Sequence, residues 1–489
     1  MSIHRAAFWS MGAQYIIFAV QFAVSVIISR FFLNPAEVGL FSIGLTVAMM
    51  VSVLQDFGIS RFIIGRSDID RETVQTCASM SCLFSALVAA LILAIAWPAA
   101  MFYDEPRLFW ILATIAGSYA VVPWSVIPVA LIMKDMAFEK LFKVNVAGVL
   151  ANAVTALSLA WVGFSAESLA WATVAQALTR AIVAQMLRPS AIGWPLSFKH
   201  AKPVIAFGST SSALAISGAI GVRSPDLIIG RILDFASVGL YSRASGLAGQ
   251  LHTLVLGAMT GIFYPAFAKL RDEGREFGPH YERVVAAFGA VVWPSMTVLA
   301  VAAYPVVSFL YGEKWVEAAP LLMMLAFAEI CFIAIPLHID IPILLGKFKA
   351  LLRYNILDTL ASVTTLIIAA HYGLLAAASS RLVYGLIWYA IYARFMHRLT
   401  GFRWSVLIGI YVKSALLSVL TASPILLAYH FWLPAHAIGF LAIIPLLLVG
   451  GLLWLGGVFA LRHPARVEIV TIFGNAMKLP LFARWLKTA

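Results

Sequence analysis

The chain has 489 residues, of which 62% are of the types AVILMFWYC and only 11% are charged, and its mean hydropathy is +0.94. Soluble domains average about 45–50% apolar and about 25% charged residues, so this composition provides too few charges to coat soluble domains and argues against a soluble enzyme. The net charge of +12 would suggest a nucleic-acid partner if the positive residues formed a surface patch.

Long apolar runs occupy most of the chain. A membrane-spanning helix needs about 20 mostly apolar residues. The alternating pattern of an outer-membrane barrel is absent, so we expect an all-α, polytopic integral membrane protein with about 14 transmembrane helices. The expected spans are 8–31, 38–57, 77–99, 108–133, 142–164, 168–187, 209–233, 238–263, 284–310, 318–345, 355–372, 374–393, 406–429 and 438–461.

Lysine and arginine are distributed unevenly between alternate loops. If the N-terminus is cytoplasmic, 25 of the 34 lie on the cytoplasmic side, four lie outside and five lie within spans. A missed or added span would reverse this bias in mid-chain. We therefore expect both termini in the cytoplasm, with the positive charge beside anionic lipid and no nucleic-acid partner.

A segment near the N-terminus has a second copy about 200 residues later. Residues 27–31 (IISRF) precede 38–42 (VGLFS), and residues 228–232 (IIGRI) precede 238–242 (VGLYS). Six spans separate the copies, so two six-helix lobes would insert in the same orientation, as parallel repeats. The predicted divisions are an N-lobe (1–187), a cytoplasmic linker (188–208), a C-lobe (209–395), two accessory spans (396–461) and a cytoplasmic tail (462–489).

Ionisable residues inside the spans are few, and each costs roughly 2.5–3.5 kcal/mol at a helix centre, so they tend to face an interior or a cavity. Arg223 and Asp226 share a helix face, and Pro225 between them predicts a kink. The pair can be a self-neutralising structural contact or a substrate or coupling site. The in-span ionisable residues are Arg180, Arg223, Arg243, Arg381, Lys413, Asp56, Asp226, Glu329, Asp340 and Asp358.

Three further arginines, Arg180, Arg243 and Arg381, lie within about two helical turns of a span end. They can snorkel to the interface or line a cavity. A guanidinium binds phosphate oxygens through two hydrogen bonds and stays charged when partly desolvated. The substrate-binding candidates are therefore Arg223, Asp226, Arg381, Arg180 and Arg243.

Five residues are candidates for coupling or gating. Glu329 lies about 16 Å into its span at 1.5 Å per residue and is a candidate proton-titrating carboxylate. Asp56 and Arg61, near the inner face, are either a cytoplasmic gate pair or solvated charges. Two prolines interrupt each of the fourth and tenth spans, at corresponding places in the two lobes, which indicates a central site or a hinge. They are Pro123 and Pro128, and Pro336 and Pro342. The hinge candidates are Pro128 and Pro342.

Catalytic and metal-binding motifs are missing from the sequence. It contains no G-x-x-x-x-G-K-[ST], H-E-x-x-H or G-x-S-x-G pattern, and its ten histidines lack metal-ligand spacing. No soluble segment exceeds about 30 residues, which is too short for an ATP-hydrolysing or glycosyl-transferring domain. We expect no enzyme activity, metal or cofactor; an H⁺ or Na⁺ gradient, the membrane potential, or consumption of substrate on the far side would supply the energy.

Several short segments resemble one transporter family. They are residues 30–42 with Pro35, Glu37 and Gly39, the D-x-x-I-G-R segment 226–231 before V-G-x-Y, the Tyr264-Pro265 pair, and Y-G-x-x-W at 311–315. Together they resemble the polysaccharide-transporter branch, the Wzx-like flippases, of the multidrug, oligosaccharidyl-lipid and polysaccharide flippase superfamily. The resemblance covers essentially the whole chain.

The resemblance implies a V-shaped pair of lobes around a cavity that opens alternately to each side. It implies an undecaprenyl-diphosphate-linked sugar repeat unit as substrate, flipped across the bacterial inner membrane for exopolysaccharide or lipopolysaccharide biosynthesis. Membrane lipids and the polymerase and export machinery would be the partners. Two alternatives stay open. The first is an ion-coupled multidrug or cation exporter, in which carboxylates and aromatic side chains would dominate the cavity. The second is a polysaccharide polymerase or ligase, which usually needs a sizeable outer loop.

Overall fold

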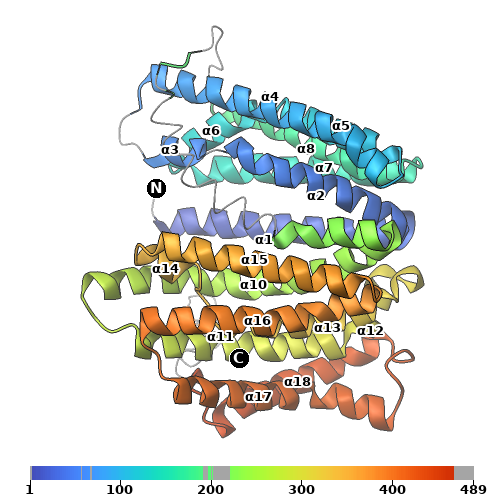
Figure 1. Ribbon diagram of the computed structural model, residues 1–489, viewed down its shortest axis with the longest axis vertical. Helices are drawn as coiled ribbons and strands as arrows, with labels where there is room; N and C mark the ends of the chain where they lie inside the picture. Colours follow the sequence, from blue (N-terminus) through green and yellow to red (C-terminus); the bar gives the residue numbers. More distant parts are fainter. Residues whose placement is uncertain are drawn as a thin grey trace, which may run out of the picture. The chain divides into compact units, whose positions relative to one another are not determined.

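The computed structural model describes residues 3–56, 58–65, 69–190, 197–199, 201 and 221–466. All regular elements in this part of the chain are helices, so the predicted all-α fold is confirmed (Figure 1). The chain divides into two compact units, Met1–Ser242 and Arg243–Ala489. Within each unit the long helices lie side by side with roughly aligned axes, as expected for apolar helices that bury their faces against one another (Figure 1).

The N-terminal unit contains eight helices, a π-helical turn, a further helical stretch at 221–232 and the start of α10, among the residues described. In chain order they are α1 (Ile3–Ile27), the π-helical turn η1 (Ile28–Phe32), α2 (Pro35–Asp56), α3 (Ile59–Gly65), α4 (Arg71–Phe102), α5 (Arg107–Tyr119), α6 (Pro123–Lys134), α7 (Phe138–Trp161), α8 (Ala166–Leu187), residues 221–232, and α10 (Phe235–Asp272).

The C-terminal unit continues from α10 and consists of eight further α-helices and one 3₁₀ turn in the described part. They are α11 (Gly278–Val301), α12 (Ala303–Tyr311), the 3₁₀ turn η2 (Glu313–Trp315), α13 (Ala318–Ile333), α14 (Asp340–Leu344), α15 (Phe348–Ala370), α16 (Leu374–Thr400), α17 (Trp404–Phe431) and α18 (Phe440–Ala460).

Nine of the described helices are long and apolar enough to cross a membrane, and the bent pair of α5 and α6 raises the number to ten. This confirms a polytopic membrane fold. Each expected span coincides with a described helix or helix pair, although for the seventh only 221–232 can be compared. The number of fourteen crossings and the lobe boundaries stay predictions, and most of the linker and tail lies outside the described residues.

Breaks occur in the fourth and tenth spans, as their prolines predict, next to Pro123 and Pro336 and away from the gating candidates Pro128 and Pro342. The axes of α5 and α6 differ by 47°, and the break lies directly before Pro123, whereas Pro128 lies inside α6. The tenth span is interrupted between α13 and α14, where Pro336 lies, and Pro342 is buried inside α14. A proline fits the first turn of a helix and restricts the residue before it, which accounts for the start of α6 at Pro123.

The two copies of the repeated segment begin their helices in the same register, 200 residues apart. Before α2, the Asn34 side chain accepts a hydrogen bond from the Glu37 N–H (3.0 Å), and the Glu37 carboxylate accepts one from the Asn34 N–H (2.9 Å). Before α10, the Asp234 carboxylate accepts a hydrogen bond from the Ser237 N–H (2.6 Å). Both helices thus start with a short polar cap that satisfies otherwise unpaired N–H groups.

The same two copies contact each other at their glycines, inside the N-terminal unit. A Cβ atom on Gly39 would lie 1.8 Å from the carbonyl oxygen of Phe235, and a Cβ on Gly239 would lie 1.9 Å from that of Pro35. The hydroxyl oxygens of Ser42 and Ser242 are 3.1 Å apart. Only glycine permits this approach of two helix backbones, so the glycine in each copy is required by the other copy.

Candidate functional site

Arg223 and Asp226 lie on the helical stretch 221–232, which is hydrogen-bonded to two other helices of the N-terminal unit. The Thr46 hydroxyl of α2 donates to Asp226 Oδ2 at 2.9 Å, and the Tyr103 hydroxyl, directly after α4, donates to the Leu227 carbonyl at 3.0 Å. The positive charge of Arg223 acts on the Asp226 carboxylate. Asp226 is therefore anchored to the buried Thr46, a partner that sequence reasoning missed, and its contact with substrate stays a prediction.

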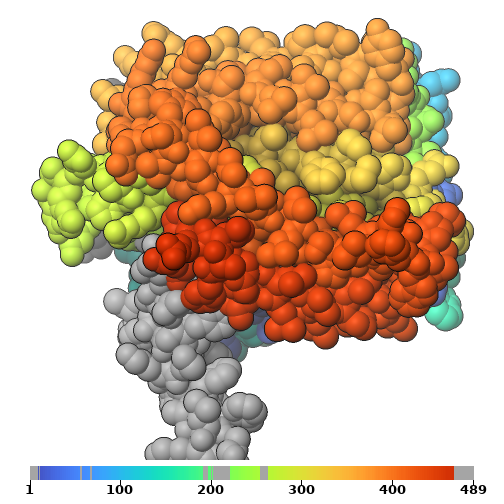
Figure 2. Space-filling model, turned by 90° about the horizontal axis from the view of Figure 1, so that it is seen from below, coloured from blue at the N-terminus to red at the C-terminus, as the bar shows by residue number. Residues whose placement is uncertain are grey.

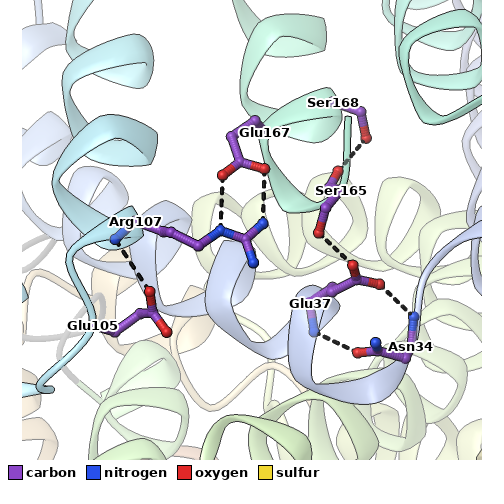
Figure 3. Close-up of polar contacts among 7 residues, drawn as sticks. All are labelled: Asn34, Glu37, Glu105, Arg107, Ser165, Glu167 and Ser168. Atoms are coloured by element: carbon purple, nitrogen blue, oxygen red, sulfur yellow. Dashed lines mark hydrogen bonds and ion pairs between the residues drawn. The ribbon is translucent and has the colours of Figure 1, made fainter. Parts of the chain in front are cut away.

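A polar network joins the ends of α2, α5 and α8 (Figure 3). Ser165, directly before α8, donates from its hydroxyl to Glu37. Arg107, the first residue of α5, donates from Nε and Nη2 to the two carboxylate oxygens of Glu167 at 3.0 and 2.9 Å. These hydrogen bonds hold the pKa of the Glu167 carboxyl below its usual range. Arg107 is thus committed to a bidentate structural pair at a helix end.

Arg403 has a similar role in the C-terminal unit. It precedes α17 and donates to the Glu282 carboxylate of α11 from its backbone N–H, Nε and Nη2, at 2.9, 3.2 and 3.0 Å. Glu282 is buried and Arg403 is exposed. The guanidinium therefore satisfies a buried carboxylate and joins the start of α17 to α11.

Arg180, on α8, has a different environment. It lines a cavity of about 260 Å³ between helices of the N-terminal unit. Its Nε atom is buried and has no hydrogen-bond partner, and no carboxylate forms an ion pair with it among the residues described. This side chain is not committed to a structural ion pair, in contrast to Arg107.

Arg381, on α16, lies among aromatic rings and hydroxyl groups in the C-terminal unit. Its guanidinium carbon is 5.0 Å from the ring centre of Phe332 on α13 and 4.8 Å from that of Tyr384, and Nη1 donates to the Ser362 hydroxyl of α15 at 3.3 Å. The Tyr384 hydroxyl donates to Asp358 at 2.6 Å, and Asp358 is buried. Cation–π contacts do not themselves neutralise a guanidinium. The Asp358 carboxylate, hydrogen-bonded by Tyr384, interacts with Arg381 electrostatically but does not form an ion-pair contact with it.

Glu329, the candidate proton-titrating carboxylate, contacts a histidine. His252 Nδ1 of α10 lies 2.6 Å from Glu329 Oε2 of α13, and both side chains are about one quarter exposed, at 26% and 21%. His252 acts electrostatically on His338, which lies between α13 and α14 and packs edge-on against Trp388. Sequence reasoning missed His252, because a single histidine in an apolar run carries no spacing signal.

The remaining candidates lie apart from these clusters. The Arg243 guanidinium is 5.9 Å from the ring centre of the buried Trp315. Arg61, on α3, is exposed, and the Asp56 side chain lies outside the described residues, so the gate pair stays a prediction. No group of three His, Cys, Asp or Glu side chains in the described part of the chain is arranged to hold a metal ion.

One apolar hollow lies on the side of the C-terminal unit that α17 and α18 form. These two helices, orange to red in Figure 2, cover this side. The hollow has a volume of about 340 Å³ and is lined by α11, α17 and α18, with Pro294, Thr421, Gly450 and Trp454 in its wall. Trp454 donates from Nε1 to the Ala290 carbonyl at 2.7 Å, which joins α18 to α11.

The two helical units, with nine or ten apolar helices of membrane-spanning length among the described residues, define the class: a multi-pass helical membrane protein. The structure resembles that of the lipid II flippase MurJ in its inward closed conformation, with a TM-score of 0.73 and 13% identity over 93% of this chain and 99% of that chain. It also resembles an inward-facing multidrug resistance MATE family transporter, with a TM-score of 0.62 and 14% identity over 78% of this chain and 95% of that one. At these identities the likeness establishes the fold.

Residues 27–320 match the family described as polysaccharide biosynthesis protein, and the chain belongs to this family. The lipopolysaccharide biosynthesis protein WzxC of Escherichia coli K12 is 23% identical over 322 residues, which are 65% of this chain and 65% of WzxC. The succinoglycan biosynthesis transport protein ExoT of Rhizobium meliloti is 23% identical over 407 residues, 83% of this chain and 80% of ExoT. The predicted polysaccharide branch of the superfamily is confirmed.

Proposed function

We propose that the protein is a flippase that translocates undecaprenyl-diphosphate-linked oligosaccharide repeat units across the bacterial inner membrane for exopolysaccharide or lipopolysaccharide biosynthesis. WzxC and ExoT are named for lipopolysaccharide biosynthesis and succinoglycan transport, and MurJ, whose fold is shared, is named a lipid II flippase. The relatives' names describe transport and biosynthesis, which supports a carrier rather than an enzyme.

The observation that carries the proposal is the environment of Arg381. A lipid-linked diphosphate must move its negative charge past the hydrocarbon core, so its carrier needs positive groups inside the spans that are not already neutralised. Arg381 is held by Phe332, Tyr384 and the Ser362 hydroxyl, and no described carboxylate forms an ion pair with it. A guanidinium in this setting keeps N–H donors for phosphate oxygens.

Transport would proceed by alternating access between two lobes. The His252–Glu329 contact is the proposed coupling element: protonation of the pair would change its charge, and a proton gradient would then drive the cycle. A sodium gradient is the alternative energy source. Membrane lipids and the polymerase and export machinery are the proposed partners, and both termini are proposed to be cytoplasmic.

The test uses Arg381→Ala and Arg223→Ala in a strain that lacks the chromosomal gene. Both variants should reduce polysaccharide export to the level of the deletion strain while the protein inserts in the membrane in normal amounts. Arg107→Ala is the matched control, since it removes one positive charge at a helix end and should leave export per molecule unchanged. Unchanged export in both interior variants would contradict the proposal.

The same strains discriminate the alternatives. A deletion strain that makes normal polysaccharide but becomes sensitive to cationic drugs would support the exporter. A deletion strain in which repeat units reach the outer leaflet and stay unpolymerised would support the polymerase.

A further inference from the structure

Three helices of the N-terminal unit, α3, α6 and α8, line the half-open cavity beside Arg180. Its polar lining consists of Ser60, Ser125, Thr173, Gln176 and Arg180, and valine side chains of α6 form its apolar wall. A hollow lined by a guanidinium, an amide and three hydroxyl groups differs from the apolar packing elsewhere in the unit. For example, Ile59, Ile63, Ile127 and their neighbours form a buried hydrophobic cluster.

A glycine on the neighbouring helix makes room for Arg180. A Cβ atom on Gly148 of α7 would lie 2.4 Å from Arg180 Cγ and 3.0 Å from Cδ. The aliphatic stem of Arg180 therefore crosses the backbone of α7 at a place where no other residue would fit without displacing it. The guanidinium is thus held at the cavity by packing, and its position is not that of a freely snorkelling side chain.

The polar groups that line the cavity differ in whether they can donate or accept hydrogen bonds. Ser125 donates its hydroxyl proton to the Val122 carbonyl at 2.9 Å, and Thr173 donates to the Ala170 carbonyl at 2.7 Å. Their oxygens keep lone pairs that can accept a hydrogen bond from a ligand. Arg180 contributes only donors, and its buried Nε has no partner among the described residues. A matching ligand carries an oxyanion for Arg180 and hydroxyl groups for Ser125 and Thr173, which is the chemistry of a phosphorylated sugar.

The size of the cavity limits the ligand. Pockets for drug-sized molecules usually measure about 300–1,000 Å³, and this cavity measures about 260 Å³. It fits one sugar ring or one phosphate-bearing head, and a whole repeat unit would exceed it.

The position along the helix indicates the membrane side. Arg180 lies seven residues before Leu187, the last residue of α8, or about 10 Å at 1.5 Å per residue. The end at Leu187 is the predicted cytoplasmic end, where lipid-linked sugars are made under the proposed function.

From these contacts we propose that the Arg180 cavity is a docking site for the sugar-phosphate head of the lipid-linked substrate on the cytoplasmic side, separate from the Arg381 cluster. The assignment rests on the proposed function for the identity of the substrate. The recognition chemistry, an oxyanion on Arg180 with sugar hydroxyls on Ser125 and Thr173, rests on the cavity alone.

Binding to the purified full-length protein in neutral detergent tests the site, with glucose 1-phosphate, inorganic phosphate and glucose as separate probes in calorimetric titrations. The wild-type protein should bind glucose 1-phosphate at least tenfold more tightly than either phosphate or glucose. Arg180→Ala should weaken glucose 1-phosphate binding at least tenfold, and Arg180→Lys should weaken it by less. Arg381→Ala should retain wild-type affinity for the probe.

Two further variants keep the test independent of folding defects. Thr173→Val keeps the shape but removes the hydroxyl oxygen, so it should lower the affinity for glucose 1-phosphate and leave that for inorganic phosphate unchanged. Gly148→Leu should displace the Arg180 stem and weaken both. Absence of glucose 1-phosphate binding by the wild-type protein, or equal binding by wild type and Arg180→Ala, would overturn the assignment.

The same binding experiment shows whether the phosphate group that binds in the cavity belongs to a sugar phosphate or to a phospholipid head group. Nanodiscs of phosphatidylglycerol or of phosphatidylcholine serve as the lipid arm. If phosphatidylglycerol alone abolishes glucose 1-phosphate binding, and inorganic phosphate binds as tightly as the sugar phosphate, the cavity is a site for phospholipid head groups and the sugar assignment is wrong. Binding as described, in a protein whose Arg381→Ala and Arg223→Ala variants both still export polysaccharide, would leave the recognition chemistry of the cavity intact and contradict the proposed function.

Discussion

Arginines at the helix ends and arginines in the helix interiors have different partners in this protein. Arg107 and Arg403 each direct two guanidinium nitrogens at one carboxylate, Glu167 and Glu282. Arg180 lies beside a cavity with a buried, unpartnered Nε, and Arg381 is held by aromatic rings and a serine hydroxyl. No described carboxylate forms an ion pair with either interior arginine.

This contrast is informative because the sequence places Arg180 and Arg381 inside expected spans and Arg107 and Arg403 outside them, but does not show which of the four has a carboxylate partner. In a paired guanidinium the N–H donors are already hydrogen-bonded to a carboxylate of the protein, whereas in an unpaired one they remain available to a bound anion. The partner of an arginine therefore adds to its position in the span a second criterion that separates structural arginines from candidate substrate-binding ones.

The largest effect on polysaccharide export is expected when a carboxylate is introduced beside an interior arginine. Ser362→Asp places an acidic group beside Arg381 Nη1, which lies 3.3 Å from the Ser362 hydroxyl oxygen. The new pair should neutralise the guanidinium and reduce polysaccharide export at least tenfold per inserted molecule. Export is measured as polysaccharide per cell divided by protein in the membrane. Ser362→Asn is the size-matched neutral control, and equal export by the two variants would argue against a role for the free charge.

Removing the carboxylate that pairs with a helix-end arginine should lower stability and leave export per molecule nearly unchanged. Glu282→Gln weakens three hydrogen bonds to Arg403, so the midpoint of thermal denaturation and the amount of inserted protein should fall, the latter by roughly twofold. Export per inserted molecule should stay within about twofold of wild type, because this pair does not contact substrate. The exposed Glu317 provides the control Glu317→Gln, and a loss of export without a loss of protein would place Arg403 among the functional arginines.

A buried histidine beyond the end of α18 should make stability depend on pH. Burial lowers the pKa of His463 to about 4, from about 6.5 in an unfolded chain. Between these pH values the unfolded chain binds a proton that the folded protein does not, so the free energy of unfolding should fall by about 1.4 kcal/mol per pH unit on acidification. His463→Gln should flatten this slope in thermal denaturation between about pH 7 and pH 5. A slope unchanged in the variant would assign the pH dependence to other groups.

The smallest effect is expected from the exposed pair. Pairs of this kind contribute about 0.2–1 kcal/mol, so Arg107→Ala should lower the thermal midpoint slightly, and added salt should shrink the difference from wild type. Because Arg107 holds the pKa of Glu167 below its usual range, the stabilisation is present above the unfolded pKa and is lost as the pH falls through the folded value. The wild-type and variant midpoints should therefore converge in acid, and a constant difference would show that the pair is not the cause.

The helices could be predicted from the sequence because apolar runs of span length leave few alternatives. The repeat was also visible in the sequence, but the polar caps at the starts of α2 and α10 were found only in the structure. The partners of the interior charges could not be predicted in this way. Tyr384 meets Asp358, and His252 meets Glu329, across different helices, and no spacing within one helix encodes which faces pack together.

The local sequence also did not show which prolines lie at the helix breaks. The sequence indicated where the fourth and tenth spans would be interrupted, but two prolines were available in each. Pro128 and Pro342 lie inside helices, while the breaks are adjacent to Pro123 and Pro336. Which proline ends a helix depends on the packing of its neighbours, and that information is outside the local sequence.

The contact between Gly39 and Gly239 also constrains how the chain can change over generations. Each glycine makes room for a backbone carbonyl of the opposite copy, so a larger residue at either position disturbs both. After a duplication, two copies normally accumulate substitutions independently. Here they touch at the same position of their common pattern, and a change tolerated in one copy must suit the other, 200 residues away.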